Sequence, residues 1–402
     1  MSSPTPKGVG KLLARQYKAR QSSDTSEIAQ IVKLITKYGV EINEISKRSG
    51  QFKETVRYRV KEKILNRGMA VQAVVDESII GLRRIAAKVT LGDTYKEYGP
   101  QIFVAMNELC YVSAFETALP EDFYLVHASV PVERLEEFKQ LMLRIRDLGI
   151  FSSLRFYEFD WTRRAPMKAE HYDFNRGVWD FDWRSPKATE PDATMGRPGT
   201  GRSVDRIDLL ILKELQIDAS KNLVQIREAI KRKDGVDINY KTLNWHYSHH
   251  VEASGLISSY SVRWLGTTYN ETAEKPRQRQ HRYTVVNLLV EDVTEQEKMV
   301  LIGKMNRLPF LWFEAAGKDY MAQSAFPLEM ITEAMEYLKD VMKPFEGRAK
   351  YFMEDQKNSV VFSVSHKSWD EEAKKWKFEA PDLIARFENL VVKINRGPGR
   401  GD

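Results

Sequence analysis

The segment QFKETVRYRVKEKILNRGMA, residues 51–70, sets the organisation of the whole chain. Its apolar residues Val56, Val60 and Ile64 stand four positions apart, a spacing that predicts one buried face of a helix. A short helix over residues 41–48 and a turn precede it. We therefore predict that the segment is the recognition helix of a helix-turn-helix unit.

The same pattern occurs a second time in the chain. The run from Thr55 to Gly68 aligns with the run from Thr242 to Gly255 without a gap. Such a match indicates internal duplication, which favours an even number of domains in a chain of 402 residues.

Composition places the chain among globular proteins of the cell interior. Hydrophobic residues make up 42% of it, and no apolar run reaches the ~18 residues that a membrane helix needs. The N-terminal residues lack the apolar core of a secretory signal. A single cysteine, Cys110, fits a reducing compartment, where we expect it to be buried. The formal net charge of +6 and the clustered basic residues favour a cytoplasmic, nucleoid-associated protein that does not bind membranes.

We predict an α+β fold made of two tandem copies, each a winged helix-turn-helix followed by a βαββαβ ferredoxin-like sandwich. In both copies a wing is expected directly after the recognition helix, as two short strands over residues 69–84 in the first copy and as the strand 257–265 in the second. Residues 162–183 are interpreted as an irregular extension packed on the first sandwich. The predicted parts are a basic N-terminal arm (1–23), the first winged helix-turn-helix (24–82), the first sandwich with its extension (83–184), a linker (185–203), the second winged helix-turn-helix (204–265), the second sandwich with a C-terminal helix (281–393) and a tail (394–402).

Two basic stretches outside the predicted domains have alternative interpretations. The arm 1–23 has five basic and no acidic residues, which suits contact with phosphates but also a solvated tail. The run GRPGTGR, residues 196–202, resembles an arm that binds the minor groove, but a flexible linker uses the same residues.

The outward positions of the two predicted recognition helices are the candidate DNA-binding residues. They are Gln51, Lys53, Arg57, Tyr58 and Lys61 in the first copy and Lys241, Asn244, Trp245, His246 and Ser248 in the second. Lysine and arginine there suit phosphate or guanine contacts in a major groove, although charged helix faces are often only solvated. For Trp245, packing against the wing is the alternative. The first copy should supply more electrostatic affinity, and the second more uncharged contacts.

Three histidines in the second recognition helix raise the question of a metal. His246 and His250 are four residues apart and share a helical face, next to His249. Because no carboxylate or cysteine nearby in the sequence completes a ligand set, we expect these rings to contact DNA and predict no metal and no cofactor. Without a phosphate-binding glycine loop, a GxSxG or an HExxH motif, the chain is not expected to be an enzyme. Catalysis would require residues that converge from distant segments.

Local motifs resemble the Lrp/AsnC (feast/famine) transcription regulators, of archaeal type and in tandem. They are VDRIDLLILKELQIDAS at 204–220, TVRYRVKEKILNRG at 55–68 and AAGKDYMA at 315–322. The resemblance implies a sequence-specific regulator that binds double-stranded DNA. It also implies a small-molecule effector, such as an amino acid, near Gly317 and Asp319. Dimerisation through the sandwiches is expected, either as a homodimer or as a pseudo-dimer inside one chain. Because the two recognition helices differ, the predicted DNA site is asymmetric.

Two other functions fit the same pattern. One is an architectural, nucleoid or transcription-scaffold protein that binds DNA broadly, which equal affinity for specific and random DNA would favour. The other is RNA binding, since the RRM module shares the βαββαβ order. Its basic-glycine-aromatic run is missing from the two candidate strands, FYLVHASV and YMAQSAFP.

Overall fold

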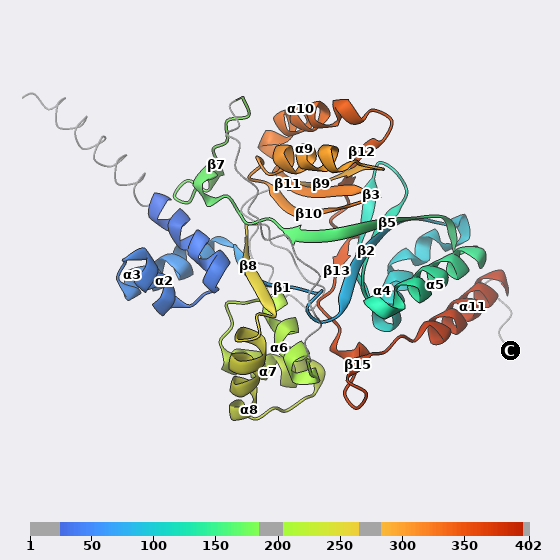
Figure 1. Cartoon of the computed structure of the whole chain (residues 1–402), viewed down its shortest axis with the longest axis horizontal. Coiled ribbons are helices and arrows are strands. Elements are labelled where there is room, and N and C mark those ends of the chain that lie inside the picture. The colour runs from blue at the N-terminus through green and yellow to red at the C-terminus, as the bar shows by residue number, and fades with distance from the viewer. Residues whose placement is uncertain (1–24, 185–203, 265–282, 397–402) are drawn as a thin grey trace, which may run out of the picture.

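The computed structural model describes residues 25–184, 204–264 and 283–396, which form an α+β structure of two helical units and a large antiparallel sheet (Figure 1). The predicted α+β class is confirmed. The basic arm, the GRPGTGR run and the C-terminal tail from residue 397 lie outside the described residues.

The first helical unit contains the segment that organises the sequence. It consists of a helix over residues 25–38, α2 (Ile42–Ser49) and α3 (Lys53–Tyr58), which continues as η1 (Arg59–Ile64) and η2 (Leu65–Arg67). The predicted stripe of Val56, Val60 and Ile64 is buried against the other helices. Gly50, with φ of 68°, ends α2 in the left-handed conformation and allows the tight turn into α3.

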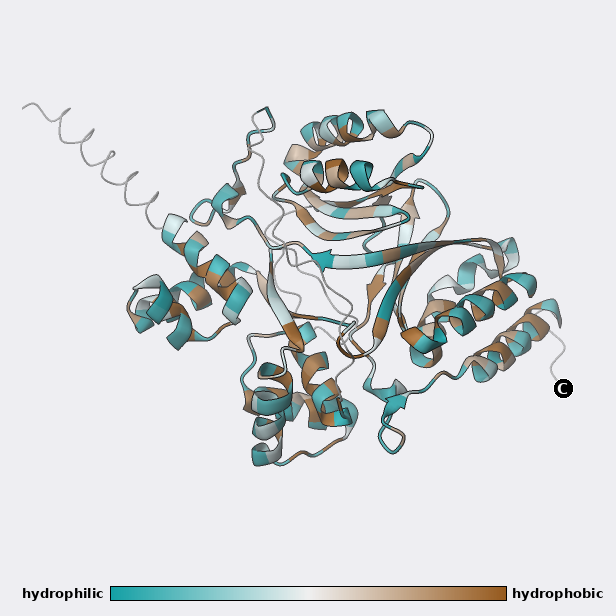
Figure 2. Ribbon diagram, in the orientation of Figure 1, coloured by the Kyte–Doolittle hydropathy of each residue, from teal (hydrophilic) through white to brown (hydrophobic). Residues whose placement is uncertain are grey.

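The second helical unit repeats this arrangement. It consists of α6 (Arg206–Ile217), α7 (Leu223–Asp234) and α8 (Tyr240–Trp245), which continues as η6 (His246–Glu252). Asp205 and Asn222 begin α6 and α7 as capping boxes, in which the side chain accepts from a backbone N–H of the first turn. In Figure 2 the outer segments α3 and α8 are mainly hydrophilic, whereas the side of α6 that faces its unit is hydrophobic.

A two-stranded ribbon joins the two helical units. Strand β1 (Ala70–Val75) pairs antiparallel with β8 (Ile257–Arg263), so that Ala70 lies opposite Arg263. The expected wing of the first unit is wrong, because β1 forms no hairpin within its own half. Alternating apolar residues predict a strand but do not choose its partner. After β1 the chain turns over residues 76–81 and enters the large sheet.

Both halves contribute a βαββαβ run to that sheet. The first contains β2 (Leu82–Leu91), α4 (Gly99–Cys110), β3 (Val112–Leu119), β4 (Tyr124–Pro131), α5 (Leu135–Asp147) and β5 (Phe151–Arg164). The second contains β9 (Tyr283–Val290), α9 (Glu295–Met305), β10 (Leu311–Gly317), β11 (Tyr320–Pro327), α10 (Ile331–Met342) and β12 (Ala349–Glu354). In each half the strands lie in the order fourth, first, third, second, as β5-β2-β4-β3 and β12-β9-β11-β10.

Two pairings between the halves close these eight strands into a ring. In one, β5 pairs with β10 from Phe159 to Arg164, and in the other β12 pairs with β3 at two positions. The interpretation of residues 162–183 as irregular is therefore wrong at its start, because residues 162–164 extend β5 along β10. Short strand β13 (Val360–Val361) adds to β3. A ring of eight strands has an interior that side chains can fill or that can hold one small ligand.

The inside of the strand ring changes character along its length. One end is filled by an apolar cluster drawn from both halves, in which Phe123 and Phe352 pack edge to face at 4.9 Å between ring centroids. The inward positions of the other end are polar, and include Glu116, His127 and Gln323. The ring is thus closed by apolar packing at one end and lined by polar side chains at the other.

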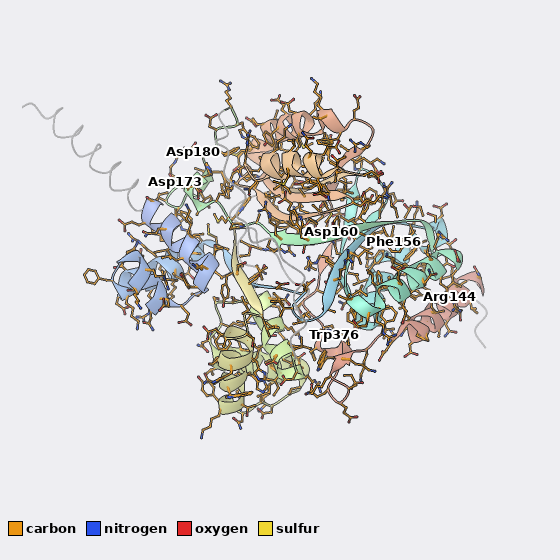
Figure 3. All side chains as sticks on the ribbon, viewed as in Figure 1. Arg144, Phe156, Asp160, Asp173, Asp180 and Trp376 are labelled. Atoms are coloured by element: carbon orange, nitrogen blue, oxygen red, sulfur yellow. The ribbon has the colours of Figure 1, made fainter. Side chains whose placement is uncertain are left out.

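Two short hairpins and a C-terminal helix complete the structure. They are β6 (Tyr172–Asp173) with β7 (Val178–Trp179), β14 (Trp369–Asp370) with β15 (Lys375–Trp376), and α11 (Ala380–Arg396). Helix α11 lies along α4 and α5 (Figure 1), where Arg144 of α5 donates to Glu388 at 3.4 Å. Trp376, labelled in Figure 3, donates from Nε1 to the carbonyl of Ile80 at 2.8 Å, so β15 is attached below the polar end of the ring.

Candidate functional site

A cavity of about 1340 Å³, including open solvent at its mouth, occupies the polar end of the strand ring. Its walls come from strands of both halves, from α6 and β8 of the second helical unit, and from residues 356 to 365. A concave site with a few convergent polar groups is the usual form of a small-molecule site. Apart from neighbouring strands such as β3 and β4, these segments lie far apart in the sequence, so folding brings most of their residues together.

A buried histidine and carboxylate stand at the centre of this cavity. His127 of β4 is 4% exposed, and its Nε2 lies 3.2 Å from Oε1 of Glu116 on β3, without the angle of a hydrogen bond. Glu116 accepts from Asn287 Nδ2 at 3.0 Å and from the side-chain amide of Gln323. These two donors from the second half fix the carboxylate, and leave the imidazole nitrogen available to hold or donate a proton.

Three guanidinium groups stand against aromatic rings in the same wall. Arg84 and Arg164 lie 5.6 and 5.2 Å from the ring centroid of Phe313, and Arg263 lies 4.9 Å from the ring of Trp312. Arg84 is also paired with Glu77. Guanidinium groups bind carboxylates in a planar, two-point geometry, and aromatic faces beside them accept a flat apolar body. The indole N–H of Trp312 is buried without a protein partner, and offers one more donor.

Glu354, at the end of β12, adds a second carboxyl group to the cavity wall. Burial, and then the negative charge of Glu116, raise the pKa of Glu354 to about 8. At neutral pH this side chain is therefore protonated and neutral. It does not repel an anionic ligand, and it can donate a hydrogen bond to one.

The first recognition helix presents most of its predicted DNA-binding residues to solvent. Lys53, Arg57, Tyr58 and Lys61 are exposed. Arg57 is paired with the neighbouring Glu54, an exposed pair that contributes little to stability. Gln51 differs from the others, because its side chain accepts from Arg59 at 2.7 Å and is only partly exposed.

The second recognition helix is arranged differently. Lys241, Asn244 and Trp245 are exposed and Ser248 is partly exposed; the 48% exposure of Trp245 speaks against the packing alternative. His246 is only 8% exposed and points inward, with Nδ1 2.9 Å from Asp208 of α6. The expectation that its ring contacts DNA is therefore wrong.

The reason for that error is a missed pair of carboxylates. Asp205 and Asp208 begin α6 and meet His246 and His250, although the sequence separates them by about forty residues. The prediction that no carboxylate completes the histidine set is wrong for this reason. It holds only for residues close in the sequence.

Gly317 and Asp319, the predicted effector residues, lie at the opposite side of the ring. A Cβ atom on Gly317 would be 2.5 Å from the carbonyl oxygen of Glu158, so β5 passes too close for any side chain. Asp319 is 5% exposed and accepts from the backbone of Asp292 at 3.1 Å. It lines a second hollow with Arg83, Arg155, Phe156, Glu158, Asp160 and Lys318. Figure 3 labels Phe156 and Asp160 of β5 there. Effector binding remains a prediction.

Sequence periodicity does not single out the cavity residues. Glu116, His127, Asn287 and Gln323 each interrupt a strand that periodicity assigns to a core. Polar residues at inward strand positions were the available signal, because buried polar groups need partners or ligands. Their convergence depends on pairing between the halves, which periodicity does not encode.

No protein-family model and no curated protein sequence matches this chain. Solved structures similar to it include the siroheme decarboxylase NirDL, at 12% identity and a TM-score of 0.47 over 90% of this chain and 99% of that one. They also include NirDL in complex with an iron-uroporphyrin III analogue, at 10% identity and a TM-score of 0.45 over 91% of this chain and 99% of that one. NirDL is an enzyme, which contradicts the expectation, drawn from missing motifs, that a chain of this kind is not one. Among the described residues no helix is long and apolar enough to cross a membrane.

Proposed function

We propose that this chain is an enzyme that binds a flat, carboxylated organic molecule at the polar end of the strand ring and replaces a carboxylate by a proton. One observation carries the proposal: three guanidinium groups that stand against aromatic rings line the same cavity as a buried histidine. The arginines match carboxylates, the rings match a flat body, and the histidine supplies a proton.

Decarboxylation requires little of the protein beyond these groups. The bond between the carboxylate and its carbon breaks, CO₂ leaves, and the electron pair remains on carbon. That carbon then takes a proton from His127, and a C–H bond forms. Arg164 and Arg263 hold the carboxylates that remain, and Glu354 in its neutral form adds a hydrogen bond. Glu116, which is held by Asn287 and Gln323, lies 3.2 Å from the imidazole of His127 that supplies the proton.

The test uses the full chain and a porphyrin polycarboxylate, which combines several carboxylates with a flat aromatic body. Binding is followed by the absorption of the pigment, and loss of CO₂ by mass spectrometry of the product. His127→Gln should bind the pigment but form product roughly 100-fold more slowly or worse. Arg263→Gln should weaken binding, and Arg155→Gln, outside this cavity, should do neither. A wild-type chain that does not bind the pigment would refute the ligand class; binding without any product would refute the reaction.

As a second function, we propose that the two helical units are helix-turn-helix units of the Lrp/AsnC type and bind double-stranded DNA at an asymmetric site. The exposed Lys53, Arg57 and Lys61 support it, together with the β1–β8 ribbon that joins both units within one chain. In this interpretation the two βαββαβ runs are ferredoxin-like sandwiches that form a pseudo-dimer. Protection of a specific sequence in a footprint, with unequal halves, is the expected result.

A further inference from the structure

Four potential metal ligands meet in the second helical unit, away from the ring cavity. Asp205 and Asp208 belong to the start of α6, while His246 and His250 lie one turn apart on η6. One ligand atom from each of the four lies within 4.8 Å of all the others. The cluster therefore joins the first helix of the unit to its recognition helix.

Three of the contacts between these residues are close to the spacing around a tetrahedral zinc ion. Ligand atoms ~2.0–2.1 Å from zinc lie ~3.3–3.4 Å from one another. His246 Nδ1 lies 2.9 Å from Asp208 Oδ1 and 3.4 Å from Asp205 Oδ2, and His250 Nδ1 lies 3.1 Å from Asp208 Oδ2. We propose that Asp205, Asp208, His246 and His250 form a binding site for a divalent transition-metal ion of the zinc class.

The surroundings hold these ligands in place. Asp205 uses Oδ1 to accept from the backbone of Ile207 and Asp208, which turns Oδ2 toward His246. Asp208 is fully buried and accepts from the backbone N–H of Asp205 at 3.0 Å. Such contacts behind the ligands fix their orientation and raise metal affinity. The ring of Trp245, 4.6 Å from that of His250, shields the site from solvent on one side.

Charge also favours a cation at this point. Two carboxylates meet within hydrogen-bond distance of imidazoles, and one of them, Asp208, has no exposed surface. Lys374, a cationic side chain whose charge interacts with both carboxylates, is itself paired with Glu371. A buried negative charge is costly unless it is paired, and a divalent ion would pair both carboxylates at once.

The first helical unit provides an internal comparison. Arg59 aligns with His246 in the gapless repeat, and its guanidinium lies 2.5 Å from Glu27 Oε2, on the first helix of that unit. An arginine cannot serve as a metal ligand, because it has no lone pair to offer when charged. The two units therefore make the same helix-to-helix connection, one through a fixed ion pair and one through a set of metal ligands.

The test uses the full chain after removal of metals with a chelator, titrated with Zn²⁺ by calorimetry and with Co²⁺ by visible absorption. Wild type should bind one zinc ion at this site and give the intense absorption of tetrahedral cobalt. In the double variant His246→Gln/His250→Gln the zinc affinity should fall more than about 100-fold. Replacing a residue that only hydrogen-bonds to a metal ligand already lowers metal affinity roughly 10- to 100-fold, and the loss of two ligands should exceed this. His249→Gln, on the same helix but outside the cluster, should bind like wild type.

Asp205→Asn keeps the buried Asp208 and serves as a second test if the double variant folds poorly, which circular dichroism without metal will show. It should weaken zinc binding and shift the cobalt spectrum. Equal zinc affinity in wild type, the double variant and Asp205→Asn would overturn the proposal. So would a wild-type chain that binds no zinc at micromolar concentration, in which case the cluster is a hydrogen-bond network only.

Discussion

The two helical units make the same helix-to-helix connection through different side chains. Each must fix its recognition helix to its first helix, and the first does so with Arg59 and Glu27, the second with His246, His250 and Asp208. Guanidinium remains charged at any physiological pH, whereas imidazole changes its charge and binds metals. The same connection is therefore an ion pair in one unit and a set of potential metal ligands in the other.

The two helix-to-helix connections should differ most in the free energy of unfolding that is lost when their carboxylates are removed. Asp208→Ala, measured with chelator present, should lower the free energy of unfolding by about 3 kcal/mol, because a buried carboxylate loses hydrogen bonds to two rings. Glu27→Ala should cost about 1 kcal/mol, since Glu27 is 41% exposed. Urea unfolding measures both. Equal losses would show that the two connections are equivalent.

The two strand pairings that close the ring, β5 with β10 and β12 with β3, should also contribute different amounts to the free energy of unfolding. Gly317→Val forces a side chain onto the β5 backbone and should cost about 2 kcal/mol. Met353→Ala, at the two-residue contact of β12 with β3, removes an exposed side chain and should cost under about 1 kcal/mol. Gly303→Ala, with open space around its α-carbon in α9, is the control and should not destabilise. A larger loss at Met353 would reverse the ranking of the two contacts.

The DNA-binding proposal predicts unequal contributions from the two recognition helices. Lys53→Ala/Lys61→Ala should lower the slope of log affinity against log salt by about 2, because each lysine that neutralises a phosphate contributes close to one. Lys241→Ala should lower it by about 1. Fluorescence anisotropy with a bound oligonucleotide at several salt concentrations gives these slopes. A larger change for Lys241 would assign the main electrostatic contact to the second unit.

A final difference concerns a pair of carboxyl groups contributed by different halves. The pKa of Glu354 is raised from 4.5 to about 8, so its contribution to stability is complete below 4.5 and is lost as pH rises through 8. Glu354→Gln should therefore lose less stability than wild type over this window. Glu116→Gln removes the charge that helps to raise the pKa of Glu354, and should lower that pKa. Unfolding measured as a function of pH tests both; identical profiles for wild type and Glu354→Gln would contradict the coupling.

Local features of the sequence predicted the elements well. Apolar residues alternate over residues 84–91, where β2 occurs, and Thr294 and Glu297 have the spacing of a capping box, which begins α9. Apolar periodicity and caps are properties of neighbouring residues, so one sequence suffices to detect them. The α+β class followed from these elements.

Pairing between the halves could not be predicted in this way. The pairing of β1 with β8, the closure of the strand ring and the meeting of His246 with Asp208 depend on strand partners and helix packing far apart in the chain. Gly317 shows the same limit, since a close backbone approach explains it without any ligand. The candidate cavity is built from such long-range pairings throughout, which is why periodicity assigns its residues to the core.

The closed strand ring has a consequence for how this protein could evolve. In a ring assembled from two identical chains, every substitution appears twice, at positions related by symmetry. Here each substitution appears once, so Glu116 and His127 could come from one half, and Asn287, Gln323 and Glu354 from the other. In a single polypeptide the two faces of the ring do not have to remain alike. One chain can therefore have a single specialised cavity, whereas a symmetric ring of two identical chains would have two identical sites.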